Sequence, residues 1–304
     1  MTDTTRQLYN LTRSVCYTGK IPTKYFTLSP VNANREGDKR ILIIPGNPGI
    51  CDYYITFAIR LFQATGCRLS IDCVDHAGHS GLETDVYTLS QQIQHKLDYV
   101  KQYIPDSAKL ILIGHSIGAH IAIELTKSLP YARVIKSFLL FPTIERMAVS
   151  PNGVRLVPKF ASKFYRASMV WGCFLVSCLP RSFLEGLVRW YHYPEATNAD
   201  RYCVEATSRL INKDVVSNCL YMANTEFREV VNLDMDGIRA NLDRLHFHYG
   251  PNDEWAPQTY YQDLVDKFPQ GQIVLDSENA PHAFVIKFSE HIANIVSKEI
   301  LKLW

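Results

Sequence analysis

Short apolar runs alternate with longer amphipathic stretches along most of this chain. Eight apolar runs have the length and composition of β-strands, at residues 14–18, 24–29, 41–45, 69–74, 109–114, 134–141, 245–250 and 272–276. Amphipathic stretches of helical length lie between many of them, at residues 52–64, 86–103, 117–128, 257–267 and 283–302. This alternation predicts βαβ units, and therefore an α/β fold with a mostly parallel sheet and an antiparallel pair at its N-terminal end.

The alternation stops between residues 142 and 225. No run in this region fits a strand, and aromatic, aliphatic and basic residues crowd together. We interpret the region as a helical cap inserted into an α/β core, which would then comprise residues 1–141 and 226–304. The chain shows no internal repeat and no low-complexity tract.

The sequence ILIGHSIGAHIAIEL, residues 111–125, places Ser116 where a predicted strand gives way to a predicted helix. A serine in such a tight turn is held out of the sheet, and the turn needs small neighbours, here Gly114 and Gly118. The start of the helix can stabilise an oxyanion at the same point. A chance Gly-x-Ser-x-Gly match is the alternative, but the strand before and the helix after favour a nucleophile.

A nucleophilic serine needs a base and an acid that orients the base. His282 follows the last predicted strand through a short loop, and Asp253 follows the preceding strand through a Gly-Pro-Asn turn. The order Ser116, Asp253, His282 is the one this architecture uses. A capping or turn role is the alternative for Asp253 and for His282, and Asp276 is the alternative acid.

A second oxyanion donor is expected in the loop PGNPG, residues 45–49, which follows a central predicted strand. Pro48 has no N–H, so the donor would be Gly46 or Asn47, together with the N–H of Ile117. A phosphate-binding loop is the rival interpretation, but the Lys-Ser/Thr pair that such a loop needs is absent.

Other histidines lie near these motifs. His76 and His79 in DHAGHS could suggest a metal pair, but no carboxylate–histidine set stands near them in the sequence, so we expect them to pack beneath the site. His115 is likewise expected to be a packed, hydrogen-bonded neighbour of Ser116, because two bases on one serine would compete. No metal is predicted.

Composition limits the possible classes of function but does not identify one. The 304 residues are 47% hydrophobic and carry a formal net charge of +2, which gives no overall basic bias for nucleic acid. Eight cysteines are scattered without a CxxC pair, and no basic and apolar leader is visible at the start. We therefore expect an intracellular protein with reduced thiols.

Several motifs together resemble the α/β-hydrolase superfamily: PGNPG, DHAGHSG at residues 75–81, GHSIG, the aspartate after the next-to-last strand and the late histidine. PGNPG with LIGHSIGAHIAIEL and GPNDEW is similar, more narrowly, to the lipid droplet-associated hydrolase family. The resemblance implies an eight-stranded sheet, serine ester chemistry without a cofactor, and residence on lipid droplets and the endoplasmic reticulum. Pro45-Gly46 departs from the His-Gly of many superfamily members.

The middle of the expected cap has the composition of a lipid-associating segment, at about residues 160–193. Residues 167–180 carry no charge, while residues 155–193 hold six Lys or Arg side chains against one Glu. A helix of fourteen residues rises about 21 Å, too short for a hydrocarbon core of about 30 Å. Pro180 should break the segment into two arms that insert shallowly. The lipid-facing side chains would be Trp171, Phe174, Leu175, Val176 and Trp190. A lid over the active site is the alternative.

The sequence thus predicts a serine hydrolase of hydrophobic carboxylic esters that acts at a lipid surface, and the resemblance implies that this surface is the cytosolic face of a lipid droplet or of the endoplasmic reticulum. The resemblance implies sterol esters or acylglycerols as the substrate class, and the same residues could cleave thioesters. The alternative is a non-catalytic protein that binds or organises lipid droplets on a hydrolase scaffold. The oligomeric state is left open.

Overall fold

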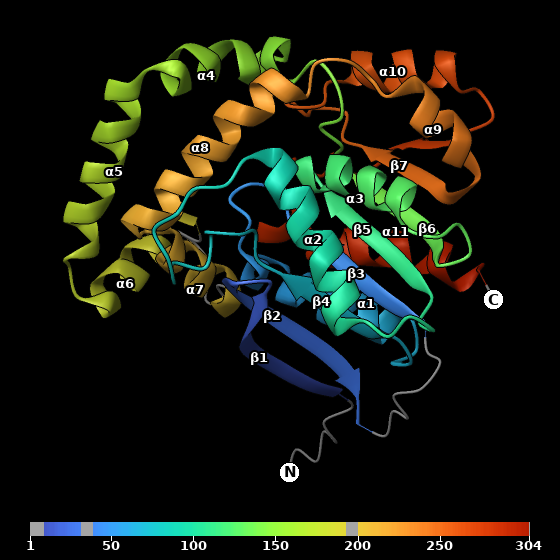
Figure 1. Ribbon diagram of the computed structural model, residues 1–304, viewed down its shortest axis with the longest axis horizontal. Coiled ribbons are helices and arrows are strands. Elements are labelled where there is room, and N and C mark those ends of the chain that lie inside the picture. Colours follow the sequence, from blue (N-terminus) through green and yellow to red (C-terminus); the bar gives the residue numbers. More distant parts are fainter. Residues whose placement is uncertain (1–8, 32–38, 193–199, 304) are drawn as a thin grey trace.

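The computed structural model describes residues 9–31, 39–192 and 200–303, and its centre is an eight-stranded sheet (Figure 1). The strand order is β1-β2-β4-β3-β5-β6-β7-β8. The strands are β1 (Tyr9–Thr18), β2 (Ile21–Pro30), β3 (Arg40–Ile44), β4 (Ser70–Val74), β5 (Leu110–His115), β6 (Val134–Leu140), β7 (Leu245–Tyr249) and β8 (Gln272–Leu275). β2 pairs antiparallel with β1 and with β4, and all other pairs are parallel. The predicted mostly parallel α/β sheet is confirmed.

Helices cover both faces of this sheet (Figure 1). One face packs against α1 (Ile55–Ala64) and α11 (Ser289–Leu301), and the other packs against α2 (Leu89–Tyr103), α3 (Ile117–Ser128) and α10 (Gln258–Lys267). Alternate residues of β3 supply the two cores: Ile41 and Ile43 face the first layer, and Leu42 and Ile44 face the second. Because both faces are covered, the central strands are continuous apolar runs rather than alternating ones.

The elements differ from their predicted limits mainly at the N-terminal hairpin and the last helix. β1 and β2 each have ten residues, longer than the predicted 14–18 and 24–29, because the two strands pair with each other along their whole length, from Tyr9↔Pro30 to Thr18↔Ile21. Gly19, with φ of 62°, lies in the turn that joins them. The predicted helix 283–302 divides into η4 (Phe284–Ile286) and α11, and the predicted helix 52–64 begins with η1 (Cys51–Tyr54).

Helices fill the chain between β6 and β7. They are η2 (Met147–Val149), α4 (Pro151–Ala161), α5 (Lys163–Ser177), α6 (Arg181–His192), α7 (Arg201–Leu210), α8 (Lys213–Glu229), α9 (Met235–Asn241) and η3 (Leu242–Arg244). The boundary expected at residue 225 falls inside α8. Residue 193, the expected end of the lipid-associating segment, lies outside the described residues.

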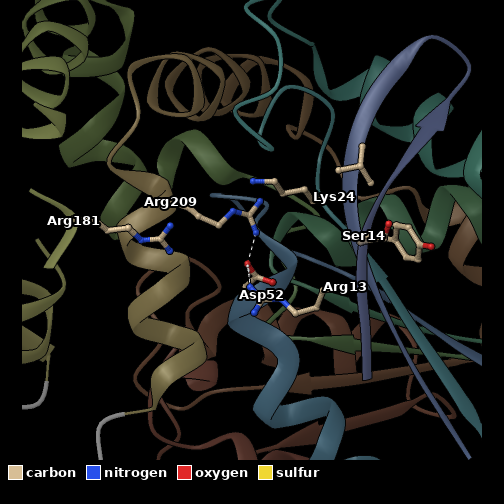
Figure 2. Close-up of a pocket in the computed structure, with 8 residues that line it drawn as sticks. Arg13, Ser14, Lys24, Asp52, Arg181 and Arg209 are labelled. Carbon is tan, nitrogen blue, oxygen red and sulfur yellow. Dashed lines mark hydrogen bonds and ion pairs between the residues drawn. The ribbon is translucent and has the colours of Figure 1, made fainter. Parts of the chain in front are cut away.

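A buried ion cluster ties the last turn of α7 to the core (Figure 2). The Arg209 guanidinium donates to Asp52 of η1 and, at 2.5 Å, to Asp75 in the loop after β4. The side chains of the two aspartates are only 4% and 0% exposed, so water cannot replace Arg209 as their partner. Arg13 of β1 also pairs with Asp52, at 3.0 Å. A buried carboxylate without its cation is costly, so this cluster fixes α7 against the core.

We therefore expect Arg209→Met to lower the free energy of unfolding by about 3–5 kcal/mol, because it leaves two buried carboxylates without their shared partner. Urea unfolding followed by circular dichroism measures the change. Arg201→Met, at the exposed start of the same helix, is the matched control and should leave the unfolding midpoint nearly unchanged. Equal midpoints for the two variants would contradict the anchoring role.

Candidate active site

Ser116 lies between β5 and α3 with φ of 55° and ψ of −123°, a conformation that residues other than glycine rarely adopt. Its neighbours leave no room for side chains. A Cβ at Gly114 would lie 2.3 Å from the carbonyl oxygen of Gly118, and one at Gly118 would lie 2.2 Å from that of Ile44. The turn therefore requires glycine at both positions, as the motif predicts, and it holds the serine at the end of the sheet.

Two hydrogen bonds join Ser116, His282 and Asp253. His282 Nε2 lies 2.9 Å from Ser116 Oγ, and His282 Nδ1 lies 2.6 Å from Asp253 Oδ2. The three residues follow β5, β7 and β8, whose carboxyl ends lie at one edge of the sheet. The structure thus brings together the three residues that the sequence selects as nucleophile, base and acid.

Asp253 has the environment of an ionised acid. Its Oδ1 accepts from the backbone N–H groups of Trp255 and Ala256, at 2.7 and 3.1 Å. Burial alone would raise the pKa of Asp253, but His282 and these N–H groups hold the pKa below its ordinary value.

Asp276, the alternative acid, contacts other histidines. Its Oδ2 lies 3.0 Å from His248 Nε2 and 2.8 Å from His291 Nε2, and its Oδ1 accepts from the N–H groups of Glu278 and Ala280. It therefore supports the start of the loop that carries His282. Asp253 is the carboxylate that contacts the imidazole.

His115 is a packed and hydrogen-bonded residue, as expected. The Gly46 N–H donates to Tyr54 Oη at 2.8 Å, and Tyr54 Oη lies 2.6 Å from His115 Nδ1. His115 Nε2 lies 2.8 Å from the carbonyl oxygen of His282, which can only accept. We infer from these partners that Tyr54 donates to Nδ1 and that the proton of His115 is on Nε2. Burial, with the nearby His282, lowers the pKa of His115 to about 3, so the ring is neutral.

The hydrogen bonds of Tyr54 also bear on which backbone N–H groups are free to bind an oxyanion. Because the Gly46 N–H donates to Tyr54 in this structure, the bonding favours Asn47 over Gly46, the two alternatives that the sequence offers. The backbone N–H groups of Asn47 and Ile117 have no acceptor among the described residues. Asn47 lines the same pocket as Ser116, which makes these two N–H groups the pair able to meet an oxyanion there.

Helix α8 holds Asn47 in place. The side-chain amide of Asn47 donates to the carbonyl oxygen of Cys219 at 2.9 Å and to Glu226 Oε1 at 3.1 Å. Glu226 is 1% exposed, and burial raises its pKa to about 8. The sequence analysis missed Glu226 and Tyr54. One sequence signal could have identified Glu226: this acidic residue lies at helical spacing from Met222, Ala223 and Val230, which are buried.

An apolar pocket of about 330 Å³ opens at Ser116. Its polar residues are Asn47, Ser116, Glu226 and His282, and its remaining lining is Pro48, Met147, Leu156, Phe160, Leu210, Val216, Cys219, Leu220, Ala223 and Trp255. Most of these apolar side chains come from the region between β6 and β7. The cavity drawn in Figure 2, of about 360 Å³, is lined instead by charged residues and contains no triad residue. Of these two cavities, the one with the mostly apolar lining is therefore the one at Ser116.

His76 and His79 pack beneath the PGNPG loop, as expected. His79 Nδ1 lies 2.5 Å from the carbonyl oxygen of Pro48, and a Cβ at Gly49 would meet both imidazole rings. Within the described ranges, no group of three or more His, Cys, Asp or Glu side chains could hold a metal ion.

The residues selected for a lipid surface are exposed on α5 and α6. Trp171, Leu175 and Trp190 are 66%, 67% and 70% exposed, and Phe174 and Val176 are each 38% exposed. The two helices meet at Pro180, and no described residue of α5 is fully buried. In the part of the chain that the structure describes, no single helix is long and apolar enough to cross a membrane, whereas α5 and α6 together pass that test as a pair bent by 116°.

Residues 37–285 match the family model for lipid-droplet associated hydrolases. The chain belongs to this family. A lipid droplet-associated hydrolase of Gallus gallus is 37% identical over 270 residues, which cover 84% of this chain and 82% of the relative. The one of Homo sapiens is 34% identical over 277 residues (86% and 84%), and the one of Drosophila melanogaster is 31% identical over 309 residues (91% and 94%).

Solved structures confirm the fold class. A carboxylesterase of Nitrososphaera gargenis aligns with a TM-score of 0.66 at 13% identity, covering 96% of this chain and 98% of that one. A bacterial membrane phospholipase A aligns with a TM-score of 0.63 at 14% identity, covering 96% and 86%. At these identities the likeness is one of fold, and the fold of this family member is that of an α/β-hydrolase.

Proposed function

We propose that this protein is a serine hydrolase of hydrophobic carboxylic esters. The observation that carries the proposal is the hydrogen-bonded series Ser116, His282 and Asp253 at the end of an apolar pocket. The family name of its relatives, lipid droplet-associated hydrolase, supports both the reaction class and a lipid substrate.

Each residue of the site has a defined part in the proposed reaction. Ser116 Oγ attacks the ester carbonyl carbon while His282 Nε2 takes its proton, and Asp253 stabilises the imidazolium that forms. The N–H groups of Asn47 and Ile117 stabilise the oxyanion. His282 then protonates the leaving alcohol, which leaves an acyl group on Ser116. Water, activated by the same imidazole, attacks this acyl-enzyme and releases the acid.

The lining of the pocket favours substrates with long acyl chains over substrates with polar or charged groups. Its aliphatic and aromatic side chains offer no ionised partner to a charged substrate, because the carboxyl of Glu226 is largely neutral below pH 8. Sterol esters and acylglycerols are the proposed substrate class, and thioesters would use the same residues.

The proposed place of action is the cytosolic face of a lipid droplet or of the endoplasmic reticulum. The exposed aromatic and aliphatic side chains of α5 and α6 are suited to shallow insertion, and Lys163, Arg166, Arg181 and Arg189 lie on the same two helices. Basic side chains at the edge of such a surface favour phospholipid headgroups.

We expect Ser116→Ala to lower kcat for p-nitrophenyl butyrate by about 10³-fold or more, because it removes the hydroxyl that lies 2.9 Å from His282 Nε2. A fluorophosphonate probe, applied with and without a lipid emulsion, should label wild type at Ser116 and not label the variant. Ser90→Ala, an exposed serine on α2, is the control and should be labelled like wild type. Absence of wild-type labelling under both conditions would favour a non-catalytic lipid droplet protein.

The pH profile should report Glu226. As the pH rises through about 8, this buried carboxyl ionises beside Asn47. The negative charge of the Glu226 carboxylate then repels the negative charge that forms on the oxyanion. Even at a separation of about 8 Å and an effective dielectric of about 20, two such charges repel by about 2 kcal/mol, so kcat/KM should fall by at least about tenfold.

Glu226→Gln keeps the acceptor for Asn47 but cannot ionise, so its kcat/KM should stay high above pH 8. The nearby charge of Glu229 also raises the pKa of Glu226. Glu229→Gln is therefore the control, and its kcat/KM should still fall at alkaline pH. Melting temperatures across the same range separate this effect from unfolding. An alkaline fall that persists in Glu226→Gln would refute the role of Glu226.

Trp171→Asp combined with Leu175→Asp should release the protein from lipid droplets into the soluble fraction. A single charge placed in a lipid interior costs on the order of 2–3 kcal/mol, and the variant introduces two. Flotation of droplets measures the distribution. The control is the double variant Leu82→Asp with Val86→Asp. These two exposed apolar residues lie outside α5 and α6, so the control should remain on droplets. Retention of the Trp171/Leu175 variant on droplets would mean that the anchor lies elsewhere.

A further inference from the structure

A second apolar cavity, of about 300 Å³, lies beside α5. Its lining comes from two sides: Ser168, Met169, Gly172, Cys173 and Val176 belong to α5, and Leu210, Ile211 and Val216 belong to the end of α7 and the start of α8. None of these side chains is charged. The hydroxyl of Ser168 bonds to the carbonyl oxygen of Tyr165 in its own helix at 2.8 Å, so the cavity presents almost no polar group that needs a partner.

This cavity lies next to the pocket at Ser116. Leu210 and Val216 line both of them, so these two apolar side chains stand between the two spaces. The pocket reaches Ser116 and His282, and the cavity reaches α5. Two neighbouring apolar spaces of this size have room for more than the ester group and its nearest carbons.

The helix that lines this cavity also carries exposed apolar side chains. Phe164, Trp171 and Leu175 of α5 are 84%, 66% and 67% exposed. The same helix thus lines the cavity with one set of residues and presents another set to its surroundings. Apolar side chains are therefore found on the exposed face of α5, in the cavity beside it and in the pocket at Ser116.

We propose that the space between α5 and α8 is an acyl-chain passage, through which the fatty acyl chain of the substrate ester enters from the lipid surface and in which it lies during hydrolysis. This inference deepens the proposed function and rests on it for the chemistry at Ser116. In this proposal the acyl chain passes Leu210 and Val216, whose side chains line both spaces. Each buried methylene should favour binding by roughly fourfold, so the passage selects long chains.

The chain offers a matched pair of glycines for the test. Gly172 lines the passage, and a Cβ built on it meets no atom within 4 Å. Gly186 of α6 has the same open space around its Cβ but lies outside the lining of this cavity. Phenylalanine has a higher helix propensity than glycine, so both substitutions should preserve their helices.

Gly172→Phe should lower the ratio of kcat/KM for p-nitrophenyl palmitate to that for p-nitrophenyl butyrate by at least about tenfold, since the ring occupies space that only the long chain needs. Gly186→Phe should keep the wild-type ratio. Binding of the fluorescent fatty acid cis-parinaric acid, measured on the same proteins, should weaken by a similar factor in Gly172→Phe and stay unchanged in Gly186→Phe.

A wild-type ratio and wild-type fatty acid binding in Gly172→Phe would overturn the passage, as would equal losses in the two variants. Failure of the proposed function has a different outcome: wild type would then hydrolyse neither ester. In that case selective loss of parinaric acid binding in Gly172→Phe would still support an acyl-chain site, and unchanged binding would refute it.

Discussion

One series of hydrogen bonds holds the three loops of the site in register. It runs from the Gly46 N–H through Tyr54 and the ring of His115 to the carbonyl oxygen of His282. It therefore connects the oxyanion loop, the serine turn and the histidine loop without using any atom that the reaction needs. Tyr54 can donate to Nδ1 only if His115 is neutral. Burial lowers the pKa of His115 to about 3 and so keeps the ring neutral. We therefore expect the position of His282 beside Ser116 to depend on this series of hydrogen bonds.

The helices between β6 and β7 take part in the site as well as covering it. The Arg209 cluster fixes the end of α7 to η1 and to the loop after β4, and the next residue, Leu210, lines the pocket. From α8, Glu226 and the carbonyl oxygen of Cys219 hold the Asn47 side chain, whose backbone N–H faces the oxyanion in our proposal. A shift of these helices would therefore change both the width of the pocket and the oxyanion donors.

The sequence predicted the parts of the structure that depend on local pattern. All eight strands appear, and Ser116, Asp253 and His282 could be selected because each follows a strand whose end is readable from apolar periodicity. Tyr54 and Glu226 could not be selected in this way, because their partners lie 61 and 179 residues away in the chain. The choice between Gly46 and Asn47 has a different reason: Tyr54 lies only 8 residues after Gly46, but only the fold shows that its hydroxyl accepts the Gly46 N–H.

Two buried carboxyls near the pocket are kept in opposite protonation states by their partners. Asp253 accepts from His282 and from two backbone N–H groups, which outweigh its burial and favour the carboxylate. Glu226 accepts from one neutral amide, which does not outweigh its burial, so its proton is retained to about pH 8. In the proposed reaction, negative charge is thus placed beside His282, where it would stabilise an imidazolium, and is kept away from the oxyanion. A second ionised carboxylate beside Asn47 would oppose the charge that forms on the substrate oxygen, so an acid can line this pocket only because burial keeps it neutral.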